Sequence, residues 1–356
     1  MEKLQKTLIL FISFVTIAGF ANAQTVHVVN NNILAPDGEN VYGTLQDAVD
    51  AASDGDIIHV VPGLTGGYGD VTIAKEISLF GIGFNPDKEL EGISVVGNIR
   101  IEGGEFEATS GVLIEGLSIS AIRLDDDLNN LTIKNNLISG QLYFTNESNI
   151  SGLEISNNIF YNTTPQINFH PSSEIQNIEI QNNIFTRSTQ AIRQAHSFVL
   201  IQNNLFLADG DRNALFGLSD CIIANNIFFG MRPRGTDLER NVFTNNLTMG
   251  NDDNSFPIGD GTNTGSGNLE GVNPQFINLS LTTSVWNFDW DPGLQEGSPA
   301  ISAGSDDTDI GIFGGPSPFN TLYTGGSPIP IIQSLNLPGI IQPGQDLQIN
   351  VKARGY

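Results

Sequence analysis

A short motif that returns at a nearly fixed interval is the feature that most constrains the fold of this chain. The segment LEISNNIF at residues 153–160 has counterparts at 131–138 (LTIKNNLI), 178–185 (IEIQNNIF), 199–206 (VLIQNNLF) and 221–228 (CIIANNIF), and a weaker one at 241–248 (NVFTNNLT). The second Asn of each pair recurs every 20 to 25 residues, at Asn136, Asn158, Asn183, Asn204, Asn226 and Asn246. A period of this size indicates a solenoid, in which each repeat buries its apolar face against its neighbours. Apolar and polar residues alternate within the repeat, which is the period of a strand.

The paired Asn residues predict how the repeats turn and stack. Asn tolerates a left-handed backbone, so it can turn the chain sharply between two short strands. Coils stacked about 4.8 Å apart would place each Asn above the next, with their amides hydrogen-bonded along the stack. The six second Asn residues are therefore expected to form a ladder.

These repeats resemble the right-handed parallel β-helix proteins of the pectate-lyase-like superfamily, which carry such Asn ladders. The resemblance covers most of the chain and matches no specific activity family. It implies an all-β fold, a single-stranded right-handed parallel β-helix of roughly ten coils. We expect this solenoid to span residues 24–315.

The N-terminus reads as a secretory signal over residues 1–23. Lys3 and Lys6 give the positive start, residues 8–20 the apolar run, and residues 21–23 (ANA) the cleavage site before Gln24. Its removal leaves 13 basic and 38 acidic residues. No other apolar run is long enough to span a membrane. We expect a soluble, strongly acidic protein that is secreted to the cell exterior, the cell surface or the periplasm.

Charge and cysteine content exclude several classes of partner and site. A strongly acidic chain is unsuited to nucleic acid or to anionic membranes. The single Cys221 excludes an internal disulfide framework, and its place in the repeat predicts a buried core thiol. The protein is expected to be a monomer.

The two ends of the solenoid have sequences of a different kind. Residues 44–52 place apolar side chains at helical spacing, so we expect a short helix that caps the N-terminal end of the stack. The run GTLQDAVDAASDGDIIHVVPG at 43–63 is similar to the N-terminal cap of many secreted β-helix proteins. Residues 251–267 are polar and glycine-rich and predict an exposed loop, after which Asn268 restores the period.

Beyond the repeats, the segments 298–304 (SPAISAG) and 309–315 (DIGIFGG) look like the close of secreted bacterial β-helix proteins. Residues 316–356 contain six prolines. They either cap the C-terminal end of the solenoid, which is the interpretation we favour, or form a targeting or attachment tail.

Each coil is expected to have a third strand, whose alternation separates inward from outward residues. The inward positions align as Ile122, Leu142, Ile167, Ile192 and Leu215. The outward positions then form one stripe, Arg123, Tyr143, Asn168, Arg193 and Phe216, beside a neighbouring stripe of Asp125, Thr145, His170, Ala195 and Leu218.

Such a stripe is suited to a sugar chain. Aromatic faces stack on pyranose rings, while Arg and Asn donate to hydroxyls or to a uronate carboxylate. The resemblance implies a substrate groove along one strand column. A lyase must neutralise the carboxylate beside the acidic carbon before a base removes the proton. For this chemistry we assign Arg193 and Arg123 as neutralisers, His170 as base and Tyr143 as acid.

Asn168, Phe216 and Asp125 complete the expected substrate-binding set, and the same stripe could equally be ordinary solvated surface. The distribution of arginines favours an anionic ligand modestly. Six of the nine arginines fall within one otherwise near-neutral segment, namely Arg187, Arg193, Arg212, Arg232, Arg234 and Arg240.

Other chemistries have weaker signals. A glycoside hydrolase needs two carboxylates, and Asp127 and Glu147 hold matching places in adjacent coils. No metal site is assigned, but Ca²⁺ remains an alternative at the acidic clusters, which are residues 125–127, 209/211, 252–253 and 306–309. The sequence therefore predicts a secreted β-helix that binds or processes an extracellular polysaccharide, by lyase chemistry if it is an enzyme. The alternative is a non-catalytic structural or adhesive solenoid.

Overall fold

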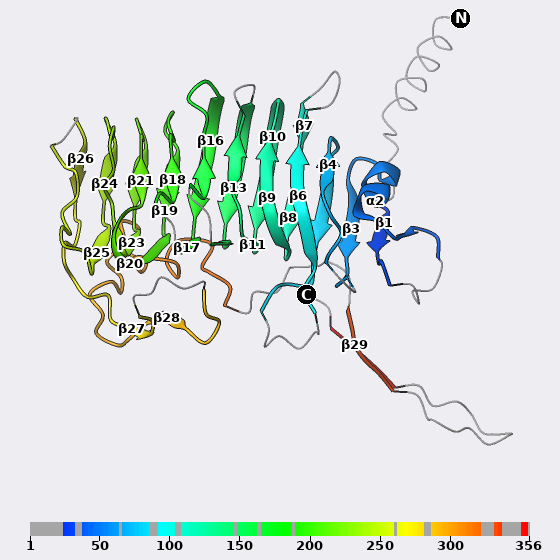
Figure 1. Cartoon of the computed structure of the whole chain (residues 1–356). Helices are drawn as coiled ribbons and strands as arrows, with labels where there is room; N and C mark the ends of the chain where they lie inside the picture. Colours follow the sequence, from blue (N-terminus) through cyan, green and yellow to red (C-terminus); the bar gives the residue numbers. More distant parts are fainter. Residues whose placement is uncertain are drawn as a thin grey trace, which may run out of the picture.

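The computed structural model describes residues 24–32, 38–63, 66–85, 92–103, 108–145, 148–161, 165–186, 189–259, 262–280, 286–321, 331–336 and 350–354. The expected signal peptide lies outside these residues. The fold is a right-handed parallel β-helix of about nine turns (Figure 1), close to the predicted ten. Among the helices of the described part, none is long and apolar enough to cross a membrane.

Each coil contributes to three columns of parallel strands, which we name by their order around the Asn pair. The first column precedes the pair and runs β2 (Val41–Tyr42), β1 (Val26–Val29), β3 (Asp56–Val60), β5 (Ile77–Phe80), β8 (Leu113–Glu115), β10 (Asp127–Lys134), β13 (Asn149–Ser156), β16 (Glu174–Gln181), β19 (Leu200–Gln202), β22 (Ile222–Ala224), β24 (Val242–Thr244) and β26 (Thr264–Ser266), with β7 (Thr109–Ser110) beside β10. The second column follows the pair with β11 (Leu137–Ile138), β14 (Ile159–Phe160), β17 (Ile184–Thr186), β20 (Leu205–Asn213), β23 (Ile227–Arg232) and β25 (Leu247–Met249).

The third column closes each coil and contains β4 (Val71–Ile73), β12 (Leu142–Phe144), β15 (Ile167–Asn168), β18 (Ile192–Arg193) and β21 (Leu215–Phe216). Two longer strands, β6 (Val95–Ile101) and β9 (Ser118–Leu124), run through both the second and third columns. Two antiparallel pairs lie outside the solenoid, β27 (Phe276–Asn278) with β28 (Asp291–Leu294), and β29 (Ile331–Asn336) with β30 (Asn350–Arg354).

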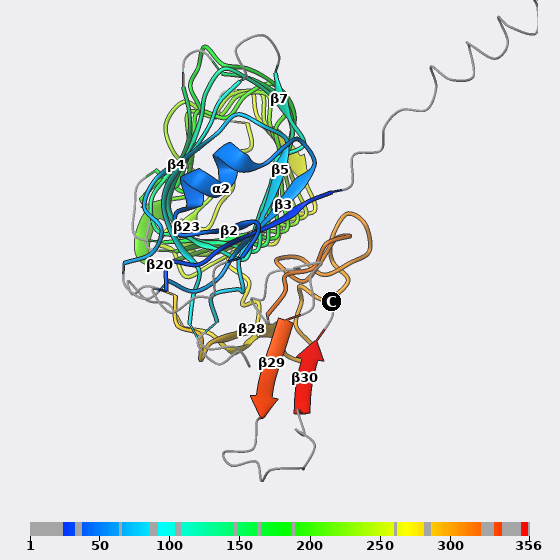
Figure 2. The ribbon, with the colours of Figure 1, turned by 90° about the vertical axis from the view of Figure 1, so that its right-hand side faces the viewer.

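Helix α2 (Leu45–Ala51) forms where it was expected and covers the N-terminal end of the stack (Figure 2). Thr44 caps it by accepting a hydrogen bond from the amide of Asp47. Leu45, Ala48 and Val49 are buried in the main core. The helix therefore shields apolar side chains that the first coil would otherwise expose to water.

The two Asn residues of each pair have separate tasks. The second Asn forms the predicted ladder: Asn183 Oδ1 accepts from the backbone amide of Asn158 at 2.9 Å, and Asn183 Nδ2 donates to Asn204 Oδ1 at 3.1 Å. The same bonds recur through all six ladder residues and continue to Asn268, which confirms the further coil. The left-handed turn, however, belongs to the first Asn, at positions 135, 157, 182, 203, 225 and 245. The turn and the ladder therefore belong to different residues of each Asn pair.

The repeat carries two apolar residues after the Asn pair, and they point in opposite directions. The Phe residues stack inside the solenoid, with ring centroids of Phe160, Phe185, Phe206 and Phe228 separated by 5.1, 4.9 and 4.7 Å. The preceding Ile or Leu faces outward and is also buried, because the C-terminal segment covers it. This second core joins Ile184 and Leu205 to Ile310 and Ile312. Cys221 is buried in the main core, as predicted.

The covering segment, residues 298–320, runs back along the outside of the second column (Figure 1). The side chains of the first Asn residues hold it. Asn182 donates to the carbonyls of Ile312 and Gly314, both at 2.9 Å, and Asn203 donates to those of Asp309 and Gly311. We call this segment the strap. Asn157 and Asn245 donate to further carbonyls of the strap, and Asn225 donates to the hydroxyl of Ser305.

One expectation about the C-terminal part was wrong. Residues 251–267 are not simply an exposed loop, because Phe256 packs against Phe243 in the core and β26 adds a final rung to the first column. Residues 316–320 lie beside the middle of the stack, where Ser317 and Asn320 bond Asn157. Most of the remaining residues up to 356 lie outside the described part of the chain, so the cap or tail stays a prediction. The β29–β30 hairpin projects from the solenoid (Figure 2).

The ladder makes a direct prediction about stability. Asn183→Leu should lower the free energy of unfolding by about 4 kcal/mol, because the fully buried amide groups of Asn158 lose their acceptor. Urea unfolding followed by circular dichroism measures the change. Asn135→Gly is the matched control, since Gly keeps the left-handed turn outside the ladder. Equal stability of Asn183→Leu and wild type would contradict the role of the ladder.

The strap makes a second prediction, which concerns local opening. In the double variant Asn182→Gly/Asn203→Gly, the backbone keeps its left-handed turns but four side-chain bonds to the strap are removed. Hydrogen exchange at residues 309–314 should accelerate about tenfold or more while the amides of β16 and β19 keep their protection. Uniform acceleration across the solenoid would show that the strap does not open separately.

Candidate functional site

The outward stripe of the third column is assembled in register, as the alternation predicted. Arg123 pairs with Tyr143, Tyr143 with Asn168, Asn168 with Arg193 and Arg193 with Phe216. The inward partners of this stripe are all fully buried, namely Ile122, Leu142, Ile167, Ile192 and Leu215. The short strands thus fix five outward side chains at intervals of one coil.

One member of the stripe was missed at the level of the sequence. Arg100 pairs with Arg123 across β6 and β9 and extends the stripe by one coil. A signal was present, because Ile99-Arg100-Ile101 repeats the pattern of Ile122-Arg123-Leu124. We call the set Arg100, Arg123, Tyr143, Asn168, Arg193 and Phe216 the arginine stripe.

At its N-terminal end the stripe is internally neutralised. The carboxylate of Asp125 accepts from Arg100 Nε at 2.6 Å and from Arg123 Nε at 2.9 Å. Arg100 also pairs with Glu102 at 2.8 Å. Burial raises the pKa of Asp125, but the hydrogen bonds from Arg123 and Arg100 outweigh it, so this pKa lies below its ordinary value. Asp125 is only 4% exposed beneath the two guanidinium groups, so its main contacts are internal.

The other end of the stripe is differently organised. Arg193 forms no ion pair with any described residue, and its guanidinium lies 5.7 Å from the centroid of the Phe216 ring. Within the described part of the chain, Arg193 Nε and the neighbouring Asn168 Oδ1 are buried and have no hydrogen-bond partner. A donor, an acceptor and an aromatic face therefore lie together on adjacent coils.

Tyr143 and His170 flank this end. Tyr143 hydrogen-bonds Arg123 and contributes to raising its pKa, after the larger effect of Asp125. His170 lies two residues beyond Asn168, and its Nδ1 accepts from the amide of Ser172 at 3.2 Å. In the neutral ring this bond assigns the proton to Nε2. The ring nitrogen lone pair that a general base requires is thus engaged by the backbone.

The neighbouring stripe is not a continuous outward surface. Ala195 and Leu218 are fully buried, and Thr145 is half-buried with its amide bonded to Ser148 Oγ. Ala195 and Leu218 therefore turn inward at the corner between the third and first columns, and only Asp125, Thr145 and His170 of this row border the stripe.

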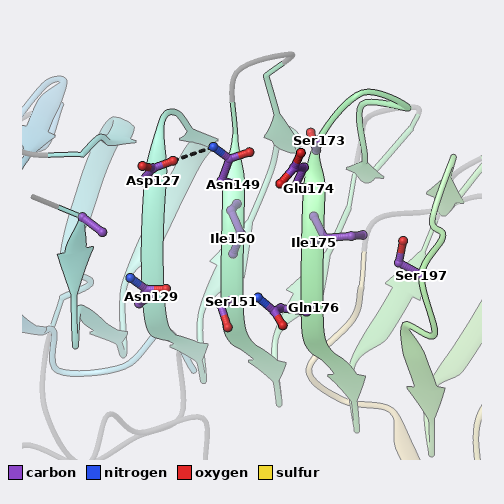
Figure 3. A pocket seen from close by; sticks show the side chains of 11 residues that line it. Asp127, Asn129, Asn149, Ile150, Ser151, Ser173, Glu174, Ile175, Gln176 and Ser197 are labelled. Atoms are coloured by element: carbon purple, nitrogen blue, oxygen red, sulfur yellow. Dashed lines mark hydrogen bonds between the residues drawn. The ribbon is translucent and has the colours of Figure 1, made fainter.

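The strand register brings together neither the two carboxylates of the hydrolase alternative nor a calcium site among the described residues. Asp127 lies opposite Asn149, which lies opposite Glu174 (Figure 3), while Glu147 is outside the described residues. No group of three or more potential metal ligands occurs among the described residues. At the expected clusters the carboxylates have internal partners: Asp125 binds arginines, Asp253 binds Arg234 and Ser255, and Asp306 binds Thr308.

Comparison with known proteins gives no assignment of activity. No protein-family model matches the chain, and no curated protein matches it either. Among solved structures, the chain is similar to the crystal structure of pectate lyase Pel9A, with a TM-score of 0.49 and 12% sequence identity over 82% of this chain and 96% of that chain. Because a match at this level does not indicate an activity, the side chains of the stripe are the guide to its chemistry.

The arginine cluster predicts a pH-dependent contribution to stability. Since the folded pKa of Asp125 lies below its ordinary value of 3.8, the ionised form favours folding; the benefit is present above about pH 4 and is lost as the pH falls through the folded value. Asp125→Asn should lower the free energy of unfolding by about 1 to 2 kcal/mol at pH 7, because two half-exposed charged donors lose their anion.

Urea unfolding at several pH values measures this difference, which should shrink as the pH drops below about 4. Asp126→Asn is the matched control, because it removes one charge from the same corner and leaves the pair with Arg100 and Arg123 intact. A difference between Asp125→Asn and wild type that is independent of pH would exclude the charged cluster as its cause.

Proposed function

We propose that this protein is exported and binds an anionic extracellular polysaccharide along the arginine stripe. The observation that carries the proposal is the end formed by Asn168, Arg193 and Phe216. There a guanidinium without an ion pair in the described structure lies beside an aromatic face and an amide oxygen without a partner there. A guanidinium donates to a uronate carboxylate, and an aromatic ring stacks on the apolar face of a sugar.

The charge of the chain supports an anionic rather than a neutral ligand at this stripe. The protein has a net charge of −24, and Arg193 nevertheless has no acidic partner among the described residues, which favours an anionic ligand at its guanidinium. Arg100, Arg123 and Arg193 lie in one column, separated from one another by whole coils. From Arg100 to Phe216 the stripe spans five steps, roughly 24 Å, which suits an oligosaccharide better than a single sugar.

A more specific version of this proposal is that the protein also cleaves the bound polysaccharide by lyase chemistry. In it, Arg193 would neutralise the uronate, His170 would remove the proton and Tyr143 would protonate the leaving oxygen. Two contacts favour binding over turnover: Arg123 is engaged by Asp125, and His170 Nδ1 is engaged by Ser172. Both must be released before Arg123 and His170 act on a substrate.

One experiment separates the versions of this function. The mature protein is incubated with a panel of uronic-acid polysaccharides, and the ultraviolet absorbance of the unsaturated product is followed. Rising absorbance that His170→Ala abolishes supports the lyase. Binding without absorbance supports an adhesive or substrate-holding solenoid. Absence of both with every polyuronate would reject the proposal and favour a structural scaffold.

Arg193 makes the quantitative prediction. Arg193→Ala should weaken binding of an anionic oligosaccharide by about 1.5 to 3 kcal/mol, the usual range for a charge-assisted bond, and unfolding should be unchanged. Isothermal titration calorimetry measures the affinity. Arg240→Ala is the matched control, because that arginine lies outside the stripe and pairs with Asp220. Unchanged affinity in Arg193→Ala, or an equal loss in both variants, would place the ligand elsewhere.

A further inference from the structure

A hollow on the described surface lies on the first column, around the corner from the arginine stripe. It is a groove of about 610 Å³. Two rows of outward side chains line it in register (Figure 3): Asp127, Asn149 and Glu174 form one row, and Asn129, Ser151 and Gln176 form the other. Its volume lies in the range of ordinary small-ligand sites.

The lining of this groove differs in chemistry from the stripe. Carboxylates, side-chain amides and hydroxyls contribute together with Ile150 and Ile175, and none of the described lining residues is cationic. Asn149 Nδ2 donates to Asp127 Oδ1 at 2.6 Å, which orients the amide between its two acidic neighbours. Such a surface repels uronates and offers mainly acceptors, which suits the hydroxyl groups of an uncharged sugar.

Strain at the end of the groove is the second observation. Ser197 lines the groove with a left-handed backbone at φ 57°, and Phe198 follows it at φ 63° as a residue that is 75% exposed. A bulky residue in this conformation is an outlier, and exposing an aromatic ring gains no burial energy. The amide of Phe198 is fixed by the carbonyl of Asp220 at 2.9 Å. Outliers of this kind concentrate where function maintains them.

The geometry points to a second carbohydrate site, in which this groove binds a neutral oligosaccharide and the ring of Phe198 stacks on a terminal sugar. From the coil of Asp127 to that of Ser197 the groove covers three steps, about 14 Å, so it accommodates several sugar residues. Both carboxylates are exposed, so they act as hydrogen-bond acceptors for sugar hydroxyls. This site is independent of the arginine stripe and does not rest on the function proposed for it.

Titration of the mature protein with neutral tetrasaccharides tests the inference. The probes are β-1,4-linked tetramers of glucose, xylose, mannose and galactose, and we expect at least one to bind with a Kd below about 1 mM. Phe198→Ala should weaken that binding about tenfold and Glu174→Ala about fivefold, whereas Phe198→Trp retains it. Ile222→Ala is the matched control, because it removes an exposed apolar side chain of the first column outside the groove.

Strain supplies a second readout that a merely structural role would not produce. Phe198→Gly should bind as weakly as Phe198→Ala but melt at the same temperature as wild type or higher, because Gly adopts the left-handed backbone freely. A lower melting temperature for Phe198→Gly would show that the ring supports the fold, which overturns its role as a platform.

Three further outcomes would overturn the inference. They are failure of all four tetramers to bind, binding that Glu174→Ala and Phe198→Ala leave unchanged, and binding that only Arg193→Ala removes. Tighter binding of a uronate tetramer in a Phe198-dependent manner would also reject the neutral ligand. Loss of polyuronate binding in Arg193→Ala concerns only the stripe, so failure of one site is distinguishable from failure of the other.

Discussion

The chain of buried Asn amides is the interaction on which the rest of the structure depends. Each ladder Asn accepts from a backbone amide one coil before it, which belongs to Leu117 for Asn136 and to an Asn for the others. Each also donates along the ladder and to a core carbonyl, as Asn183 does to Ile155. A buried amide that loses such partners is costly, so a slip of one residue between coils would leave several groups unsatisfied at once. The ladder therefore fixes the register of every coil from Asn136 to Asn268. Because the three columns share that register, it also sets which outward side chains come to lie beside one another.

Much of this could be predicted from the sequence, because local rules govern it. The period of the Asn pairs gave the ladder, and alternation in the third strands placed Arg123, Tyr143, Asn168, Arg193 and Phe216 in one column. Alternation succeeds here because a shift by one residue would expose Ile122 or Ile192, which are fully buried. The helix at the N-terminal end could be predicted for the same reason, because the spacing of its apolar residues and its Thr44 cap lie within ten residues of sequence.

The missed features depend on contacts between segments far apart in the sequence. The sequence did not predict that both apolar residues after each Asn pair would be buried. The strap covers Ile184 and Leu205, and because the strap contains no repeat, its position beside them could not be predicted from the period. Asn182 donates to a carbonyl 130 residues away, so the repeat pattern could not predict that this side chain holds the strap. Likewise, the spacing of charges could not reveal that Asp125 would be covered by Arg100 and Arg123. At the end of the groove, the alternation of apolar and polar residues could not predict the left-handed backbone of Phe198.

A scaffold of this kind separates stability from recognition. The ladder, the stacked Phe rings and the strap use inward groups and the second column. Apart from the ion pairs of Arg100 and Arg123 with Asp125, the outward residues of the first and third columns therefore contribute little to the fold. These residues nevertheless inherit the rigidity of the backbone that bears them, which lowers the entropic cost of holding several groups against one ligand. The corner at residues 125–127 joins the two outward faces: Asp125 turns its charge to the arginines, while Asp127 turns its charge to the groove. This acidic corner therefore lies between the two faces: it neutralises one end of the arginine stripe, and it supplies the first carboxylate of the groove. As a result, adjacent faces of one solenoid have opposite preferences for the charge of a ligand.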